Sequence, residues 1–133
     1  MAITQGINHL GLTVLDLQRT RDFFTGLLGW EESGFDPAYP RTAVTDGHTR
    51  LTLWQVQDSD NYVGFDRKLN LGLHHLALTV ASEEALLSLY QKLAQSPDVH
   101  IEFAPEPVGK GPRKHMMCNE PGGLRIEFIW SGE

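Results

Sequence analysis

The chain contains almost no cysteine. It also has neither an excess of positive charge nor a long apolar run. The single thiol, Cys118, excludes an internal disulfide, and the N-terminal stretch has no basic region followed by an apolar core, which together favour a cytoplasmic protein. Lysine and arginine number 11 against 17 acidic residues, for a formal charge of −6, so the basic surface typical of nucleic-acid binders is lacking. No apolar run approaches the ~20 residues of a membrane-spanning helix. We expect neither nucleic acid nor membrane as a partner.

An internal repeat organises the sequence. The segments INHLGLTV, at residues 7–14, and LHHLALTV, at residues 73–80, share five identical residues. Each is followed by an apolar pattern of helical period behind a suitable N-cap, Asp16 or Ser82, and Gly29 is a suitable end for the first helix. Three segments rich in β-branched and aromatic residues then follow in each half. They predict strands near 30–35, 41–45 and 50–57, and near 99–104, 113–119 and 124–130.

The fold class predicted from this pattern is α+β, with two βαβββ modules at about residues 5–57 and 71–131, joined by a polar linker at 58–70. A chain of about 130 residues builds one core, and one helix cannot cover both faces of a four-stranded sheet. We therefore expect a single domain over residues 1–133, in which the modules pair into curved, barrel-like mixed sheets around a shared site.

Three side chains stand out on the face opposite the large apolar residues. Strand alternation places His9 there, the repeat gives His75 the same position, and the last predicted strand adds Glu127. Two imidazoles and one carboxylate that share a space can hold one divalent metal, Fe, Mn, Ni, Co or Zn, and leave positions open for substrate. A hydrogen-bonded structural role is the alternative for any single strand histidine.

The repeated HLGLTV and HLALTV segments, the stretch DLQRTRDFFTGLLGW and the ending NEPGGLRIEF resemble the vicinal oxygen chelate superfamily over nearly the whole chain. That superfamily includes glyoxalase I, extradiol dioxygenases, fosfomycin-resistance enzymes and bleomycin-resistance proteins. The resemblance implies paired modules around a metal, with His9, His75 and Glu127 as ligands and Glu127 as the catalytic carboxylate. It implies lyase, isomerase or oxygenase chemistry on a small oxygen-chelating substrate. A metal-free protein that sequesters a drug or metabolite is the alternative.

Four further residues are predicted to lie beside the substrate: Arg50, Thr52, Trp54 and Arg125. Thr52 aligns with Glu127 in the other half and is a poor metal ligand. The two arginines suit a carboxylate or phosphate, although pairing with an acidic residue at the sheet edge is an equal alternative.

Other polar residues are expected to have structural roles. His74 precedes a proposed ligand and is expected on the opposite face of the strand. Cys118 has no identifiable activating base, which argues against a nucleophile.

A homodimer is also predicted. Trp30 and Trp54 are expected outside the helix-covered faces, where they leave aromatic surface and strand edges for a partner to cover. The modules could then close within one chain or between two chains.

Overall fold

The structure is a computed structural model that describes residues 1–133. The residues form two compact units, 1–62 and 63–133. In the first unit the elements are β1 (Leu10–Val14), α1 (Leu17–Asp22), the π-helical turn η1 (Phe23–Leu27), β2 (Glu31–Asp36), β3 (Arg41–Thr45) and β4 (Arg50–Gln55). In the second unit they are β5 (Leu76–Thr79), α2 (Glu83–Ala94), β6 (His100–Pro107), β7 (Lys114–Asn119) and β8 (Arg125–Trp130).

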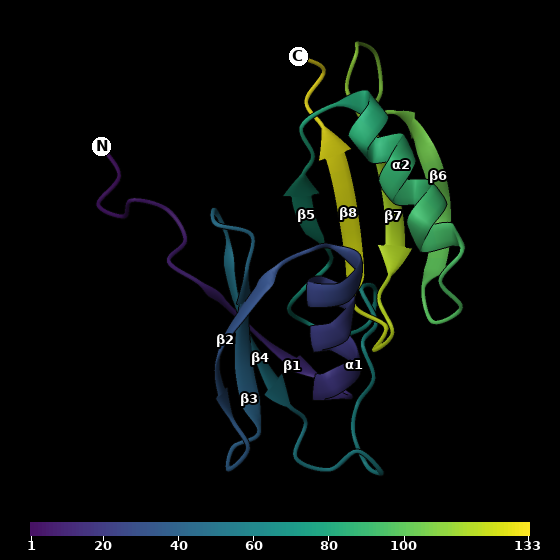
Figure 1. The fold of residues 1–133 in the computed structure, drawn as a ribbon. Helices are drawn as coiled ribbons and strands as arrows, with labels where there is room; N and C mark the ends of the chain where they lie inside the picture. Colours follow the sequence, from purple (N-terminus) through teal and green to yellow (C-terminus); the bar gives the residue numbers. More distant parts are fainter. The chain divides into compact units, whose positions relative to one another are not determined.

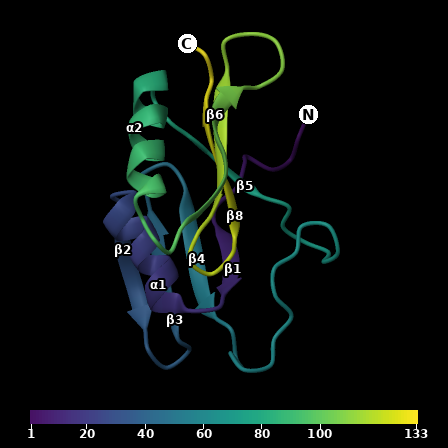
Figure 2. The same ribbon diagram turned by 90° about the vertical axis from the view of Figure 1, so that its right-hand side faces the viewer.

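Both units have the predicted βαβββ topology (Figure 1). The first sheet has the strand order β1-β4-β3-β2 and the second has the order β5-β8-β7-β6. In each sheet the first strand pairs in parallel with the last, and the remaining pairs are antiparallel. Figure 2 shows α2 along one side of the second sheet. Each sheet is open, not closed into a barrel.

Local sequence explains where the helices begin and end. The Asp16 carboxylate accepts a hydrogen bond from the Arg19 amide at 3.1 Å, and the Ser82 hydroxyl accepts one from the Ala85 amide at 3.0 Å. After the first helix the Leu28 amide donates to the Phe23 carbonyl, the wider π-type spacing. Gly29 follows with φ +73°, a conformation that favours glycine. Both predicted N-caps and the predicted helix end are confirmed.

Strand alternation separates an apolar face from a face lined by small residues. In the first sheet Leu51 and Leu53 are fully buried and pair with the apolar side of β1. On the other face Gly11 pairs with Thr52, and a Cβ at Gly11 would lie 3.2 Å from the Thr52 hydroxyl oxygen. The register in the second sheet places Ala77 beside Glu127 in the same way. The alternation predicted for these strands is confirmed.

Trp30 differs from the prediction. Its side chain is buried, and its ring lies 5.0 Å from that of Phe24, centroid to centroid. The Trp30 amide donates to the Phe24 carbonyl, so the residue closes the end of the helix and precedes β2. The expectation that Trp30 lies outside the helix-covered face was therefore wrong. Trp54, by contrast, is 37% exposed.

None of the helices has both the length and the apolar character needed to cross a lipid bilayer.

Candidate functional site

Glu127, on β8, lies between two histidines of the second unit. Its Oε1 is 3.4 Å from Nε2 of His75, which stands one residue before β5. Its Oε2 is 2.5 Å from Nδ1 of His115 on β7. The antiparallel register explains the second contact, because His115 and Glu127 lie two positions apart on the same face of neighbouring strands. The carboxylate is largely buried, at 13% exposure, and both of its oxygens face an imidazole.

The two histidines proposed as ligands have matching local surroundings. Nδ1 of His9 lies 2.7 Å from the Asn8 side-chain oxygen, and Nδ1 of His75 lies 2.8 Å from Nδ1 of His74. In both cases Nδ1 is engaged by the preceding residue, and Nε2 is left for another partner. Metal-binding histidines use one ring nitrogen for the ion and the other for an orienting hydrogen bond. The pattern therefore fits a ligand role.

Arg125 determines which nitrogen of His75 carries the proton. Its Nη1 lies 3.5 Å from Nδ1 of His74 and can only donate, so that nitrogen of His74 accepts. The hydrogen between the two histidines then belongs to Nδ1 of His75. Nε2 of His75 is consequently the nitrogen with the free lone pair, as a metal ligand requires.

The pKa of His74 is lowered from its ordinary value. Loss of hydration is the main cause, followed by electrostatic interactions with His75, Arg125 and Arg67. A neutral His74 offers the single lone pair on Nδ1 toward which both His75 and Arg125 direct a hydrogen. The expectation that His74 lies on the opposite face from His75 was wrong, because its side chain contacts both His75 and Arg125. Both histidines precede β5, which begins at Leu76, so strand alternation does not apply to them.

An ion pair fixes Arg125 itself. Its Nε donates to both oxygens of Glu102 on β6, at 3.1 and 2.9 Å, and Asn119 donates to the same carboxylate at 3.1 Å. Burial alone would raise the pKa of Glu102, but the hydrogen bonds and positive charge of Arg125, with Asn119 and Arg67, hold it below its ordinary value. Arg125 thus makes the acidic pairing that was the alternative to a substrate contact.

The first unit has different side chains at the equivalent places. Thr52 is buried, and its hydroxyl oxygen accepts from Nε1 of Trp54 at 3.1 Å. The Arg41 guanidinium lies over the Trp54 ring, 5.5 Å from its centroid, and the Tyr39 ring meets that ring edge-on. Arg50 is exposed at the start of β4 and makes no ion pair.

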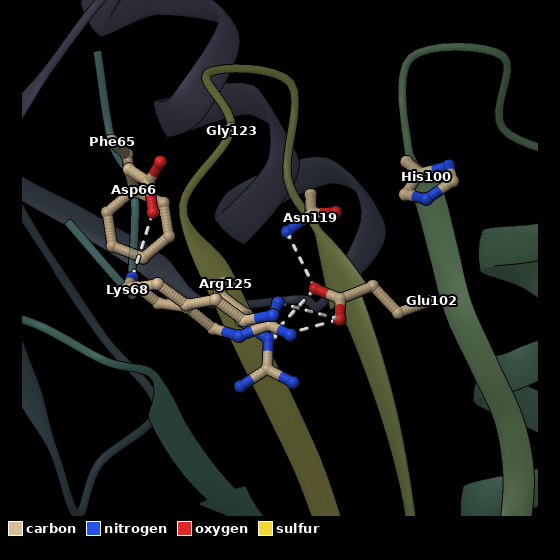
Figure 3. A pocket seen from close by; sticks show the side chains of 9 residues that line it. Phe65, Asp66, Lys68, His100, Glu102, Asn119, Gly123 and Arg125 are labelled. Atoms are coloured by element: carbon tan, nitrogen blue, oxygen red, sulfur yellow. Dashed lines mark hydrogen bonds and ion pairs between the residues drawn. The ribbon is translucent and has the colours of Figure 1, made fainter.

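A pocket of about 630 Å³ lies within the second unit, beside the Arg125–Glu102 pair (Figure 3). It is lined by Phe65, Asp66, Arg67, Lys68, His100, Glu102, Asn119, Gly123 and Arg125. Sequence reasoning found Arg125 but not Glu102, Arg67 or Lys68. The pattern of the sequence does not mark these polar residues as pocket residues. The pocket depends on the contact between Arg67 and Glu102, which are 35 residues apart in the chain.

Cys118 is buried, and burial is the main reason why its pKa is raised to about 12. A thiol with such a pKa is protonated at neutral pH, which agrees with the prediction that it is not a nucleophile.

No group of three or more His, Cys, Asp or Glu side chains is arranged to hold a metal ion as the side chains stand. The donors still suit one. Two atoms bound to one ion at about 2.1 Å, near the tetrahedral angle, lie about 3.4 Å apart, and an imidazole with a carboxylate is a common donor pair. The separation between His75 Nε2 and Glu127 Oε1 is 3.4 Å.

Comparison with known proteins agrees with the fold. Residues 6–128 match the family model of the Glyoxalase/Bleomycin resistance protein/Dioxygenase superfamily. No curated protein matches the sequence.

Three solved structures show how closely the fold is shared. A glyoxylase/bleomycin resistance protein/dioxygenase domain from Frankia sp. EAN1pec is 22% identical with a TM-score of 0.81, covering 98% of this chain and 93% of that one. A lactoylglutathione lyase from Agrobacterium tumefaciens is 14% identical with a TM-score of 0.74, covering 98% and 97%. The genomically encoded fosfomycin resistance protein of Listeria monocytogenes is 15% identical with a TM-score of 0.72, covering 97% and 95%.

Proposed function

Because the chain belongs to the glyoxalase/bleomycin resistance protein/dioxygenase superfamily, we propose that it is a divalent-metal-dependent enzyme acting on a small substrate with neighbouring oxygens. His9, His75 and Glu127 would hold one Fe, Mn, Ni, Co or Zn ion, and Glu127 would also be the catalytic carboxylate. The metal would act as a Lewis acid on oxygens of the substrate. The reaction would be of the lyase, isomerase or oxygenase type.

The observation that carries this proposal is the geometry around Glu127. Nε2 of His75 faces one carboxylate oxygen at 3.4 Å, and the hydrogen bond that His75 Nδ1–H donates to His74 leaves the lone pair on Nε2. The other oxygen accepts from His115 at 2.5 Å, which fixes the orientation of the carboxylate. His9, with Nδ1 engaged by Asn8, supplies the third donor in the proposal.

Four residues are assigned to the substrate side in this proposal. Arg50, with no ion pair, would bind an anionic group of the substrate, and the exposed edge of Trp54 would contact its apolar part. Thr52, with its hydroxyl already engaged by Trp54, would leave a coordination position open. Arg125 would act mainly through its spare guanidinium hydrogens, because its Nε is committed to Glu102.

Metal content of the untagged protein tests the proposal. Protein purified without a polyhistidine tag should carry about one divalent ion per site, measured by elemental mass spectrometry. A protein that neither contains nor binds such ions, and still binds a drug or metabolite, would contradict the proposal and favour the sequestering alternative.

The proposal includes a cytoplasmic homodimer. If modules exchange between chains, His9 comes from one chain and His75 with Glu127 from the other. Mixing a His9→Ala chain with a Glu127→Ala chain should then restore one metal site per heterodimer. Closure within each chain predicts no restoration, and a concentration-independent monomer in sedimentation would contradict the dimer.

A further inference from the structure

The pocket beside Arg125 differs in charge from the rest of the protein. The chain carries a formal charge of −6, yet the pocket walls bring together three cations, Arg67, Lys68 and Arg125, and only two carboxylates. All of these residues belong to the second unit, and Figure 3 shows Arg125 directed toward Glu102 in the pocket wall. A positive pocket on an acidic protein concentrates anions locally.

Both carboxylates of the pocket already accept hydrogen bonds from neighbouring groups. Glu102 accepts from Arg125 and Asn119, and Arg67 lies 3.4 Å from it. The Asp66 side chain accepts from the amides of Lys68 and Leu69 at 2.9 and 3.1 Å, which fixes the turn of the linker. Both oxygens of Glu102 are therefore engaged, and Asp66 uses its Oδ1 for backbone amides.

The cations, in contrast, have donors to spare. No hydrogen bond or ion pair engages the Lys68 ammonium, and Arg67 uses one of its nitrogens for Glu102. The Arg125 side chain is only 10% exposed and the Arg67 side chain 32%, so their remaining N–H groups are partly shielded from water. Charge-assisted hydrogen bonds to a ligand gain strength in such surroundings.

We propose that this pocket binds a small oxyanion, a carboxylate or phosphate group, through Lys68 together with Arg67 and Arg125. The pocket shares Arg125 with the substrate side of the proposed function, but the inference does not depend on the metal site. The Arg67–Glu102 pair alone would explain how the linker is attached to the sheet. Lys68, an exposed residue of the same wall, adds a third cation beside that pair, and an oxyanion in the pocket would meet all three.

The test uses protein stripped of metal with a chelator, so that its outcome is independent of the metal site. Inorganic phosphate and acetate are titrated separately at constant ionic strength, and amide chemical shifts are followed by NMR. We expect saturable binding in the millimolar range, with shifts centred on Lys68 and Gly123. Tighter binding of phosphate would identify the ligand as a phosphate group, and comparable binding of acetate would identify it as a carboxylate.

Lys68→Gln should weaken binding about tenfold, equivalent to about 1.4 kcal/mol. Lys110→Gln, an exposed lysine outside the pocket, is the matched control and should leave binding unchanged. Arg67→Gln should also weaken binding, and thermal melting shows whether that variant is folded. Absence of saturable shifts with both anions, or equal effects of Lys68→Gln and Lys110→Gln, would overturn the proposal.

Discussion

The two halves share one topology and differ in what they place at equivalent positions. In each sheet the last strand pairs in parallel with the first, opposite a small residue, Gly11 or Ala77. At that position the first half has Thr52, engaged by Trp54, and the second has Glu127, held between His75 and His115. The same backbone thus supports an aromatic and hydroxyl cluster in one half and an imidazole and carboxylate cluster in the other.

The neighbouring strands follow the same division. Arg41 faces Trp54 across the first sheet, whereas at the equivalent place in the second sheet His115 pairs with Ile129 and reaches Glu127. The difference teaches that fold and chemistry are specified separately: apolar alternation fixes the sheets, and a few side chains on the opposite face decide what each can bind.

The largest effect is expected from His75→Ala. Removing a proposed ligand from the second half should weaken metal binding by more than the roughly 10–100-fold that loss of an orienting partner costs. Calorimetric titration of the untagged protein with Co²⁺ or Zn²⁺ measures this. His48→Ala, in an exposed turn of the first half, is the control. If His75→Ala bound metal with unchanged affinity, the assignment of His75 in the second half as a metal ligand would be contradicted.

Glu102→Gln should lower the free energy of unfolding by about 2 kcal/mol at pH 7, because it leaves the buried Arg125 without its counter-charge. The pKa of Glu102 is lowered in the folded protein, so its contribution is complete above the ordinary value of 4.5 and is lost as the pH falls through the lower folded value. The difference in free energy of unfolding between wild type and Glu102→Gln, measured by urea denaturation, should therefore become smaller near pH 3.

Glu106→Gln on the same strand, whose side chain is 56% exposed, is the control and should change stability by less than about 0.5 kcal/mol. If the loss of free energy of unfolding in Glu102→Gln did not depend on pH, the assigned ion pair between Glu102 and Arg125 would be contradicted.

His74→Phe tests the hydrogen bond that orients His75. Without an acceptor for its Nδ1–H, His75 should bind metal about 10–100-fold more weakly, while the fold is retained. The same titration measures the loss, and His48→Phe serves as the control. Wild-type affinity in His74→Phe would show that the tautomer of His75 is fixed in another way.

The smallest effect is expected at Thr52, the counterpart of Glu127. Thr52→Ala should change metal affinity by less than about twofold, since a threonine hydroxyl is a poor ligand. Thr52→Glu should tighten binding by adding a carboxylate that makes the two halves more alike. A large loss of affinity in Thr52→Ala would mean that the first half contributes a ligand where we place none.

Much of the fold was predictable because its signals are local. The repeat, the caps Asp16 and Ser82, and the period-two alternation around Glu127 each depend on residues near in sequence, and the structure agrees with them. Trp30 was misplaced because a π-type turn, which extends the helix end, leaves no separate mark in the sequence.

The surroundings of the candidate site were less predictable. The contact of Arg125 with Glu102 joins residues of β8 and β6, and Arg67 reaches Glu102 from the linker. Such pairs depend on register and loop path, which one sequence does not determine. The place of His115 beside Glu127 could have been derived from the antiparallel pairing of the last two strands, had the register been known.

The central claim, that Glu127 and not Thr52 completes a metal site, is tested most directly by measuring the Co²⁺ dissociation constants of Glu127→Gln and Thr52→Ala beside wild type. The account predicts a loss of more than about a hundredfold in Glu127→Gln and less than about twofold in Thr52→Ala. Circular dichroism of both variants controls for folding. Equal affinities in the two variants, or wild-type affinity in Glu127→Gln, would contradict it.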